Sequence, residues 1–112
     1  MNNKIRVFMV DDNRSIVNEV KEYFSSHVGI EVTGVAYDGE EALEKISKTP
    51  EDYDLILMDL IIPKMDGLSV LEELNKKNIH LKSIVTTSMN STEVINRCME
   101  IGVNYYMLKP YN

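Results

Sequence analysis

Apolar and polar residues alternate along the chain in two patterns, which predict strands and helices in turn. Runs rich in apolar and β-branched residues are typical of buried strands and occur at residues 5–10, 55–58, 83–87 and 105–108, while residues 30–36 alternate like a half-exposed strand. Between these runs, apolar residues recur at the spacing of a helix face. The pattern predicts five strands separated by four helices.

Polar residues and a glycine mark the expected ends of the helices. Asp38 is followed three residues later by Glu41, which predicts a capping box at the start of the second helix. Asn90 and Glu93 have the same spacing and predict a capping box before the fourth helix. Gly102 is expected to end that helix, because glycine readily adopts the left-handed backbone that follows many helices.

The order of the elements predicts the fold class. Strict alternation of strands and helices with short connections is typical of a parallel sheet covered on both faces. The runs at residues 5–10 and 55–58 are the most continuously apolar and are expected at the centre, whereas the polar residues within 30–36 mark an edge strand. Right-handed crossovers then favour the strand order 2-1-3-4-5, so we predict a doubly wound α/β fold.

The composition suits one globular domain without disulfides. A chain of 112 residues buries enough surface for one hydrophobic core. Cys98 is the only cysteine and lies on the inward face of the fourth predicted helix, so we expect it in the core. Four methionines in apolar runs are also expected in the core, namely Met9, Met58, Met99 and Met107.

Charge and hydropathy argue against two classes of function. The 18 acidic and 12 basic residues give a formal net charge of −6, whereas nucleic-acid binding without sequence preference requires clustered Lys and Arg. No apolar run approaches the roughly 18 residues of a membrane span, and residues 1–4 lack the apolar segment of a signal peptide. We therefore expect a cytoplasmic domain that itself binds neither membranes nor nucleic acid.

Three carboxylates are expected to meet at one edge of the predicted sheet. Asp11 and Asp12 directly follow the first strand, and Asp59 follows the third. The predicted order places these strands side by side at the switch point of the sheet, where open α/β folds bind ligands. Thr87 and Lys109 reach the same edge from the fourth and fifth strands.

Clustered carboxylates point to a cation and to phosphoryl chemistry. Neighbouring carboxylates repel one another, and Mg²⁺ is commonly held by one or two carboxylates with waters and phosphate oxygens. A carboxylate can also attack phosphorus, while a metal and an ammonium group balance the charge of the transferred phosphoryl group. We predict Asp59 as the nucleophile beside Mg²⁺ or another divalent cation, with Lys109 and Thr87 in reach of the same phosphoryl group.

Five short motifs occur together along nearly the whole chain. They are Val-Asp-Asp-Asn at 10–13, Asp-Gly-Glu-Glu-Ala-Leu at 38–43, Leu-Met-Asp-Leu at 57–60, Pro-Lys-Met-Asp-Gly at 63–67 and Leu-Lys-Pro at 108–110. Each motif alone is common, but the combination resembles the receiver domain of bacterial two-component response regulators. The resemblance implies the CheY-like form of the flavodoxin-like fold.

The resemblance also implies a role for each residue of the acidic site. By it, Asp59 is the phosphoacceptor, and Asp12 and Asp59 bind Mg²⁺ together with the backbone carbonyl of Ile61. Asp11 would act on the metal through water, and Lys109 would contact the phosphoryl group.

The resemblance further implies a switch formed by Thr87 and Tyr106. A phosphoryl group adds about 1.5 to 2 negative charges, so it would draw the Thr87 hydroxyl toward it. Tyr106 would then rotate into the vacated space and change the surface of the fourth helix and fifth strand. Ile61 and Met89 are apolar at positions where a polar side chain could orient an attacking water, which predicts slow self-dephosphorylation.

The implied partners belong to a phosphorelay. The donor would be a sensor histidine kinase or a histidine phosphotransfer protein, and the phosphorylated state would control an attached output domain. The domain would not be an enzyme beyond catalysing its own phosphorylation and slow dephosphorylation. Residues 36–39, 60–63 and 105–111 are similar to receivers of regulators that control sporulation in Firmicutes, which implies a DNA-binding transcription output.

Three alternatives lead to different functions. A stand-alone receiver would act by docking to other proteins instead of controlling an attached domain. A magnesium-dependent phosphohydrolase would also form an aspartyl phosphate, but such enzymes usually carry Asp-x-Asp after the first strand, where this chain has Asp-Asp-Asn at 11–13. An FMN-binding module would need a Ser-, Thr- and Gly-rich loop after that strand, and this sequence has none there.

The length of the chain is short for the predicted architecture. The fifth predicted strand ends at Leu108, which leaves four residues and no room for the helix that closes this side of a receiver. We expect that residues 1–112 form a receiver cut before or within its final helix, without its output domain. The apolar surface left in this way could be covered by a second copy in a homodimer.

Overall fold

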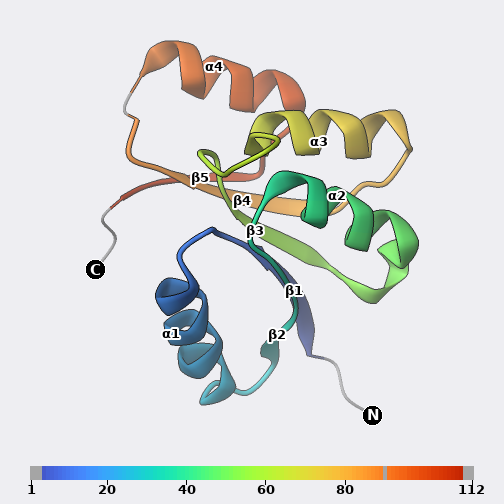
Figure 1. Cartoon of the computed structure of the whole chain (residues 1–112), viewed down its shortest axis with the longest axis vertical. Helices are drawn as coiled ribbons and strands as arrows, with labels where there is room; N and C mark the ends of the chain where they lie inside the picture. Colours follow the sequence, from blue (N-terminus) through green and yellow to red (C-terminus); the bar gives the residue numbers. More distant parts are fainter. Residues whose placement is uncertain (1–3, 90, 110–112) are drawn as a thin grey trace.

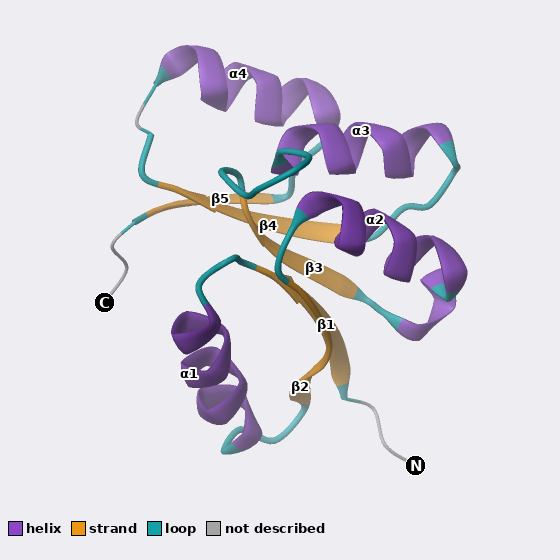
Figure 2. Ribbon diagram, viewed as in Figure 1, coloured by secondary structure: helices purple, strands orange, loops and turns teal. Residues whose placement is uncertain are grey.

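A five-stranded parallel sheet with helices on both faces forms the described part of the chain, residues 4–89 and 91–109 of a computed structural model (Figures 1 and 2). The elements in chain order are β1 (Ile5–Val10), α1 (Arg14–Ser25), β2 (Ile30–Ala36), α2 (Gly39–Lys48), a 3₁₀ turn (Pro50–Asp52), β3 (Leu55–Asp59), α3 (Gly67–Lys76), β4 (Lys82–Thr87), α4 (Thr92–Ile101) and β5 (Tyr105–Leu108). The strand order is β2-β1-β3-β4-β5, which confirms the predicted doubly wound α/β fold.

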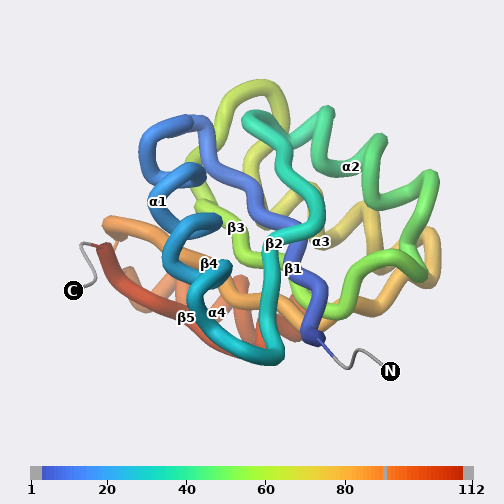
Figure 3. The backbone as a smooth tube through the Cα atoms, turned by 90° about the horizontal axis from the view of Figure 1, so that it is seen from below, coloured from blue at the N-terminus to red at the C-terminus, as the bar shows by residue number. Residues whose placement is uncertain are grey.

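The helices are divided unequally between the two faces of the sheet. Helices α2, α3 and α4 cover one face, and α1 covers the other, as Figure 1 and the view from below in Figure 3 show. The main core lies under α2, α3 and α4 and includes Phe8, Ile56, Met58 and Val85 from the strands. Residues 4–89 and 91–109 contain four α-helices, and no fifth is found among them.

An apolar groove of about 560 Å³ lies on the α1 face of the sheet. Tyr23 and Phe24 of α1 line one side of it, and Leu57, Ile84 and Met107 of the strands contribute to its lining. None of the helices formed by residues 4–89 and 91–109 combines the length and the apolar character needed to span a bilayer.

The helix ends agree with the sequence at two positions and differ at a third. Asp38 caps α2 through a hydrogen bond from the amide of Glu41, and Gly102 ends α4 with a left-handed φ of 96°. The cap of α4 is Ser91, so the predicted cap one residue earlier is wrong; Asn90 itself lies outside the described residues. The hydroxyl of Ser91 accepts a hydrogen bond from the backbone amide of Val94. This bond caps the first turn of the helix as an asparagine side chain would.

The predicted core placement is correct for three of the five sulfur-containing residues considered. Cys98, Met9 and Met58 are buried, as predicted. Met99 and Met107 are exposed, so their predicted burial is wrong. Met99 follows Cys98 on α4 and is therefore turned away from the sheet by the helical rotation of about 100° per residue. Met107 faces the groove that α1 leaves open.

Candidate functional site

Three carboxylates come together at the carboxyl edge of the sheet. Asp11 and Asp12 directly follow β1, and Asp59 is the last residue of β3, the neighbour of β1. One carboxylate oxygen from each residue lies within 4.8 Å of the others. Asp11 is 2% exposed and Asp59 is 8% exposed, whereas Asp12 is exposed at the mouth of the cluster. The pairing of β1 with β3 therefore produces an acidic crevice at the switch point of the sheet.

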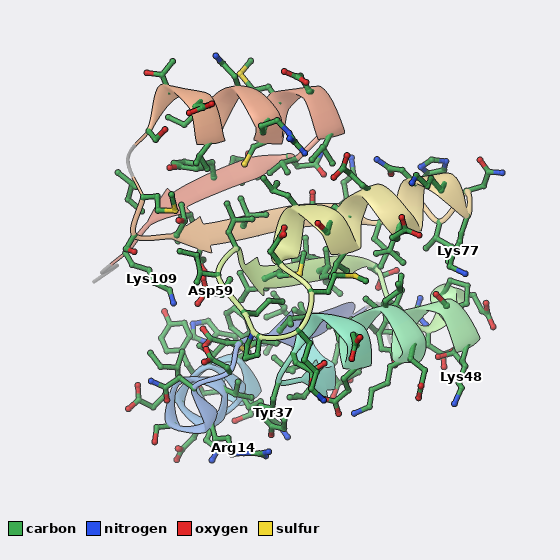
Figure 4. The ribbon with its side chains drawn as sticks, turned by 45° about the horizontal axis from the view of Figure 1, so that its top comes forward. Arg14, Tyr37, Lys48, Asp59, Lys77 and Lys109 are labelled. Atoms are coloured by element: carbon green, nitrogen blue, oxygen red, sulfur yellow. The ribbon has the colours of Figure 1, made fainter. Side chains whose placement is uncertain are left out.

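The side chain of Lys109 enters this crevice from the end of β5. Its Nζ lies 2.8 Å from Oδ2 of Asp59 and 3.5 Å from Oδ2 of Asp11. Figure 4 shows the labelled side chains of Lys109 and Asp59 meeting at this edge. The amide of Lys109 donates to the carbonyl of Thr87 at 2.8 Å, so the ladder between β4 and β5 continues to this residue and fixes its position.

The pKa of Lys109 is raised by its two acidic neighbours. Burial is the largest single influence and acts to lower this pKa, but the hydrogen bonds and charges of Asp59 and Asp11 together outweigh it. The ammonium group is therefore protonated at neutral pH, and it is positioned to bind an anionic group that approaches Asp59.

Both carboxylate oxygens of Asp59 have a hydrogen-bond donor. Oδ1 accepts from the amide of Ile61 at 3.1 Å, and Oδ2 accepts from Lys109. Ile61 lies in the β3–α3 loop, residues 60–66, and its side chain is exposed. These two contacts fix the orientation of the Asp59 carboxylate and keep the loop beside the acidic crevice.

The charges in the crevice favour a divalent cation. Burial is the largest cause of a raised pKa of Asp11, and the charge of Asp59 adds to it. The amide of Asn13, which donates to Oδ1 of Asp11 at 2.9 Å, acts in the opposite direction. Within the described residues, Lys109 is paired with Asp11 and Asp59, and Asp12 adds a third carboxylate to the cluster. A hard cation that prefers oxygen ligands, such as Mg²⁺, fits this donor set.

The sequence matches a family model over almost its whole length. That model is described as the response regulator receiver domain, and it matches residues 7–112. The chain belongs to this family. The acidic crevice of this receiver domain lies at the carboxyl ends of β1 and β3.

Solved structures of other receiver domains are similar to this one. The receiver domain of Francisella response regulator 1452 is 35% identical, with a TM-score of 0.87, 97% of this chain and 87% of that chain covered. A CheY-like receiver domain protein from Methanospirillum hungatei JF-1 is 31% identical, with a TM-score of 0.84, and the match covers 97% of this chain and 84% of that one. CheY of Borrelia burgdorferi, in a complex with CheX, BeF3 and Mg²⁺, is 26% identical, with a TM-score of 0.88 and coverages of 96% and 80%.

The two residues of the predicted switch lie on adjacent strands of this receiver domain. Thr87 is fully buried at the end of β4, and Tyr106 lies on β5, where it pairs with Val85. Tyr105 is largely exposed, which agrees with the alternation of side chains along a strand.

Met89 connects these two residues through its backbone, a link that the sequence did not reveal. Its amide donates to Oγ1 of Thr87 at 3.0 Å, and its carbonyl accepts a hydrogen bond from the hydroxyl of Tyr106. Met89 therefore contacts both Thr87 and Tyr106 through its main chain. No side-chain pattern could have identified Met89, because both contacts are made by its backbone.

Proposed function

We propose that this receiver domain accepts a phosphoryl group on Asp59 from a phosphohistidine donor in a magnesium-dependent reaction, and that the acyl phosphate controls an output. The observation that carries this proposal is the Asp59 carboxylate, held in an acidic crevice with the Lys109 ammonium group 2.8 Å away. The crevice thus brings together a nucleophile, a positively charged group and oxygen ligands for a cation. Phosphoryl transfer requires these three elements in one place.

Each residue of the crevice has a distinct role in the proposed transfer. An oxygen of Asp59 attacks phosphorus as the bond from phosphorus to the imidazole nitrogen of the donor breaks, and the nitrogen keeps the electron pair. Lys109 binds an oxygen of the transferred group, and the amide of Ile61 orients the attacking carboxylate. Asp12, Asp59 and the Ile61 carbonyl would hold Mg²⁺, with Asp11 acting through water, and the cation would supply positive charge to the phosphoryl oxygens.

The similar CheY structure from Borrelia burgdorferi supports the choice of metal, because it holds Mg²⁺ together with BeF3. The donor set here, three carboxylates within 4.8 Å, is of the type that Mg²⁺ prefers. Beyond its own phosphorylation and dephosphorylation, we do not assign an enzymatic reaction to this domain.

Phosphorylation would reach the surface through the backbone of Met89. The new phosphoryl group would accept a hydrogen bond from the Thr87 hydroxyl and draw it away from the Met89 amide, from which this hydroxyl now accepts. The Met89 carbonyl in turn accepts from Tyr106, so both hydrogen bonds are affected by one movement. The surface formed by α4 and β5 is then the part of the domain that an output partner reads.

A sensor histidine kinase or a histidine phosphotransfer protein is the proposed donor, in the cytoplasm, and a DNA-binding domain is the proposed output. The Staphylococcus aureus structure that shares this fold at 21% identity is described as a DNA-binding response regulator of the LuxR family. The similarity to sporulation regulators stays a prediction from three short sequence stretches. The homodimer likewise stays a prediction.

The proposal is tested with acetyl phosphate as a small phosphodonor. Wild-type protein incubated with acetyl phosphate and MgCl₂ is expected to gain one phosphoryl group by intact mass, and EDTA is expected to prevent the gain. Asp59→Asn should gain none, whereas the control Asp52→Asn, which changes an exposed aspartate on the 3₁₀ turn, should behave like wild type. Equal labelling of Asp59→Asn and wild type would refute the proposal, and multiple turnover of a phosphate ester would favour a phosphohydrolase.

A further inference from the structure

The β3–α3 loop packs against the first turn of α2. This turn of α2 lies outside the acidic crevice. The amide of Gly39 donates to the carbonyl of Pro63 at 3.1 Å. Nζ of Lys64 lies 3.7 Å from Oδ2 of Asp38, the residue that caps α2. Figure 3 shows the loop lying beside the start of α2. Asp38, the cap of α2, and Gly39, its first residue, therefore contact two successive residues of the loop.

Gly39 leaves no space for a side chain at this contact. A Cβ atom on Gly39 would overlap the carbonyl oxygen of Met65 and would lie 2.7 Å from its carbonyl carbon. These are backbone atoms, so the clash cannot be relieved by rotating a side chain. The glycines with a positive φ in the described chain are Gly29 and Gly102, so the backbone conformation does not explain glycine at residue 39. The close approach of the Met65 backbone explains why residue 39 is a glycine.

Two backbone hydrogen bonds close the loop on itself between Leu60 and Gly67. The amide of Met65 donates to the Pro63 carbonyl at 2.8 Å, and the amide of Gly67 donates to the Leu60 carbonyl at 2.9 Å. Lys64 has a left-handed φ of 70°, an unfavourable conformation for a residue with a side chain. These closures join Met65, beside Gly39, to the part of the loop that holds Ile61.

We propose that the first turn of α2, through Gly39, is a positioning element that sets the place of Ile61 relative to Asp59 and thereby the affinity of the crevice for Mg²⁺. Gly39 touches the loop and not the reacting atoms, so its effect passes through the loop backbone. The inference rests on the proposed function, because it treats the crevice as the metal site of the phosphorylation reaction.

The test compares Gly39→Ala with wild type in two Mg²⁺ titrations. One titration follows amide shifts of the unphosphorylated protein by NMR, and the other follows the rate of phosphorylation by acetyl phosphate. Loss of residues that orient metal ligands commonly weakens metal affinity by roughly 10- to 100-fold. We expect the half-saturating Mg²⁺ concentration of Gly39→Ala to rise about tenfold in both titrations. The phosphorylation rate at saturating Mg²⁺ should return to within a few fold of the wild-type rate.

Gly34→Ala is the matched control for a loss of stability alone. A Cβ atom on Gly34 would overlap the ring of Phe8 and lie 2.8 Å from the ring of Tyr53, in the sheet and away from the loop. It should lower the midpoint of thermal unfolding without changing the half-saturating Mg²⁺ concentration. A shift of equal size in Gly34→Ala and Gly39→Ala, or no shift in Gly39→Ala, would overturn the inference.

Substitutions of Asp38 keep the inference testable if Gly39→Ala does not fold. Asp38→Ala removes the cap of α2 and the partner of Lys64, so it should raise the half-saturating Mg²⁺ concentration several-fold. Asp38→Asn keeps the cap and should restore the wild-type value within about twofold, because asparagine caps helices as well as aspartate does. An unchanged value in Asp38→Ala would overturn the inference. Wild-type protein that neither binds Mg²⁺ nor accepts a phosphoryl group would instead refute the proposed function.

Discussion

Replacement of Lys109 by methionine tests the electrostatic account of the crevice. Lys109→Met keeps most of the aliphatic stem and removes only the ammonium group, so Asp59 loses a 2.8 Å partner and Asp11 loses a 3.5 Å partner. Two buried carboxylates then face each other without the positive charge between them. We therefore expect the free energy of unfolding to fall when no divalent cation is present.

The expected loss is about 2 to 3 kcal/mol. Breaking a buried ion pair by removing one partner costs roughly 3 to 5 kcal/mol, and a hydrogen bond to a charged group contributes roughly 1.5 to 3 kcal/mol. The Lys109 side chain is 25% exposed, so solvent screening places the loss below the upper limit. At about 4 to 8 °C per kcal/mol for a small domain, the melting temperature should fall by on the order of 10 °C.

The assay is thermal and urea unfolding at pH 7, followed by circular dichroism, in EDTA and again in MgCl₂. Mg²⁺ should stabilise Lys109→Met more than wild type, because the cation neutralises the same carboxylates and binds only the folded state. Lys82→Met, at the exposed start of β4, is the control and should change the unfolding free energy by less than about 0.5 kcal/mol. A loss in Lys109→Met no larger than in this control, or an equal effect of Mg²⁺ on both proteins, would contradict the account.

Three further predictions concern other parts of the domain. The hydrogen bond from the Tyr37 amide is the main cause of a lowered pKa of Glu41. The stability that this carboxylate contributes is therefore present above its ordinary pKa of about 4.5 and is lost as pH falls through the lower pKa of the folded state. Glu41→Gln should lose less unfolding free energy than wild type between pH 7 and pH 3, and parallel pH profiles of the two proteins would exclude this. Met89→Glu should shorten the lifetime of the acyl phosphate, measured by mass after the phosphodonor is removed, because a carboxylate there can orient water; an unchanged or longer lifetime would argue against slow self-dephosphorylation caused by Met89. Burial raises the pKa of the Cys98 thiol, so a disulfide reagent should label it slowly in the native protein and rapidly in urea, and fast native labelling would contradict its place in the core.

The sheet and the acidic crevice could be predicted from the sequence because both follow from the order of the elements. Parallel strands end at one edge, so the residues directly after β1 and at the end of β3 had to meet once these strands were neighbours. Lys109 follows from the same reasoning, as the residue after β5. In each case the identity of the residue and its place at a strand end were sufficient.

Features that depend on backbone contacts or on competing side chains could not be predicted in this way. The bond between the Tyr106 hydroxyl and the Met89 carbonyl involves a group that every residue has, so it carries no sequence signal. Ser91 and Asn90 are both good caps, and only the path of the chain decided in favour of Ser91. Met65 in the β3–α3 loop approaches Gly39 at the start of α2, and no sequence periodicity indicates that these two residues are close.

Identification of the modified residue tests the central claim most directly. After incubation with acetyl phosphate and MgCl₂, reduction with borohydride converts an aspartyl phosphate into a stable alcohol, which peptide mass spectrometry locates. The account predicts this modification at Asp59 alone, and its loss when Mg²⁺ is chelated before the phosphodonor is added. Modification at Asp11 or Asp12 instead, or labelling that does not depend on a divalent cation, would contradict it.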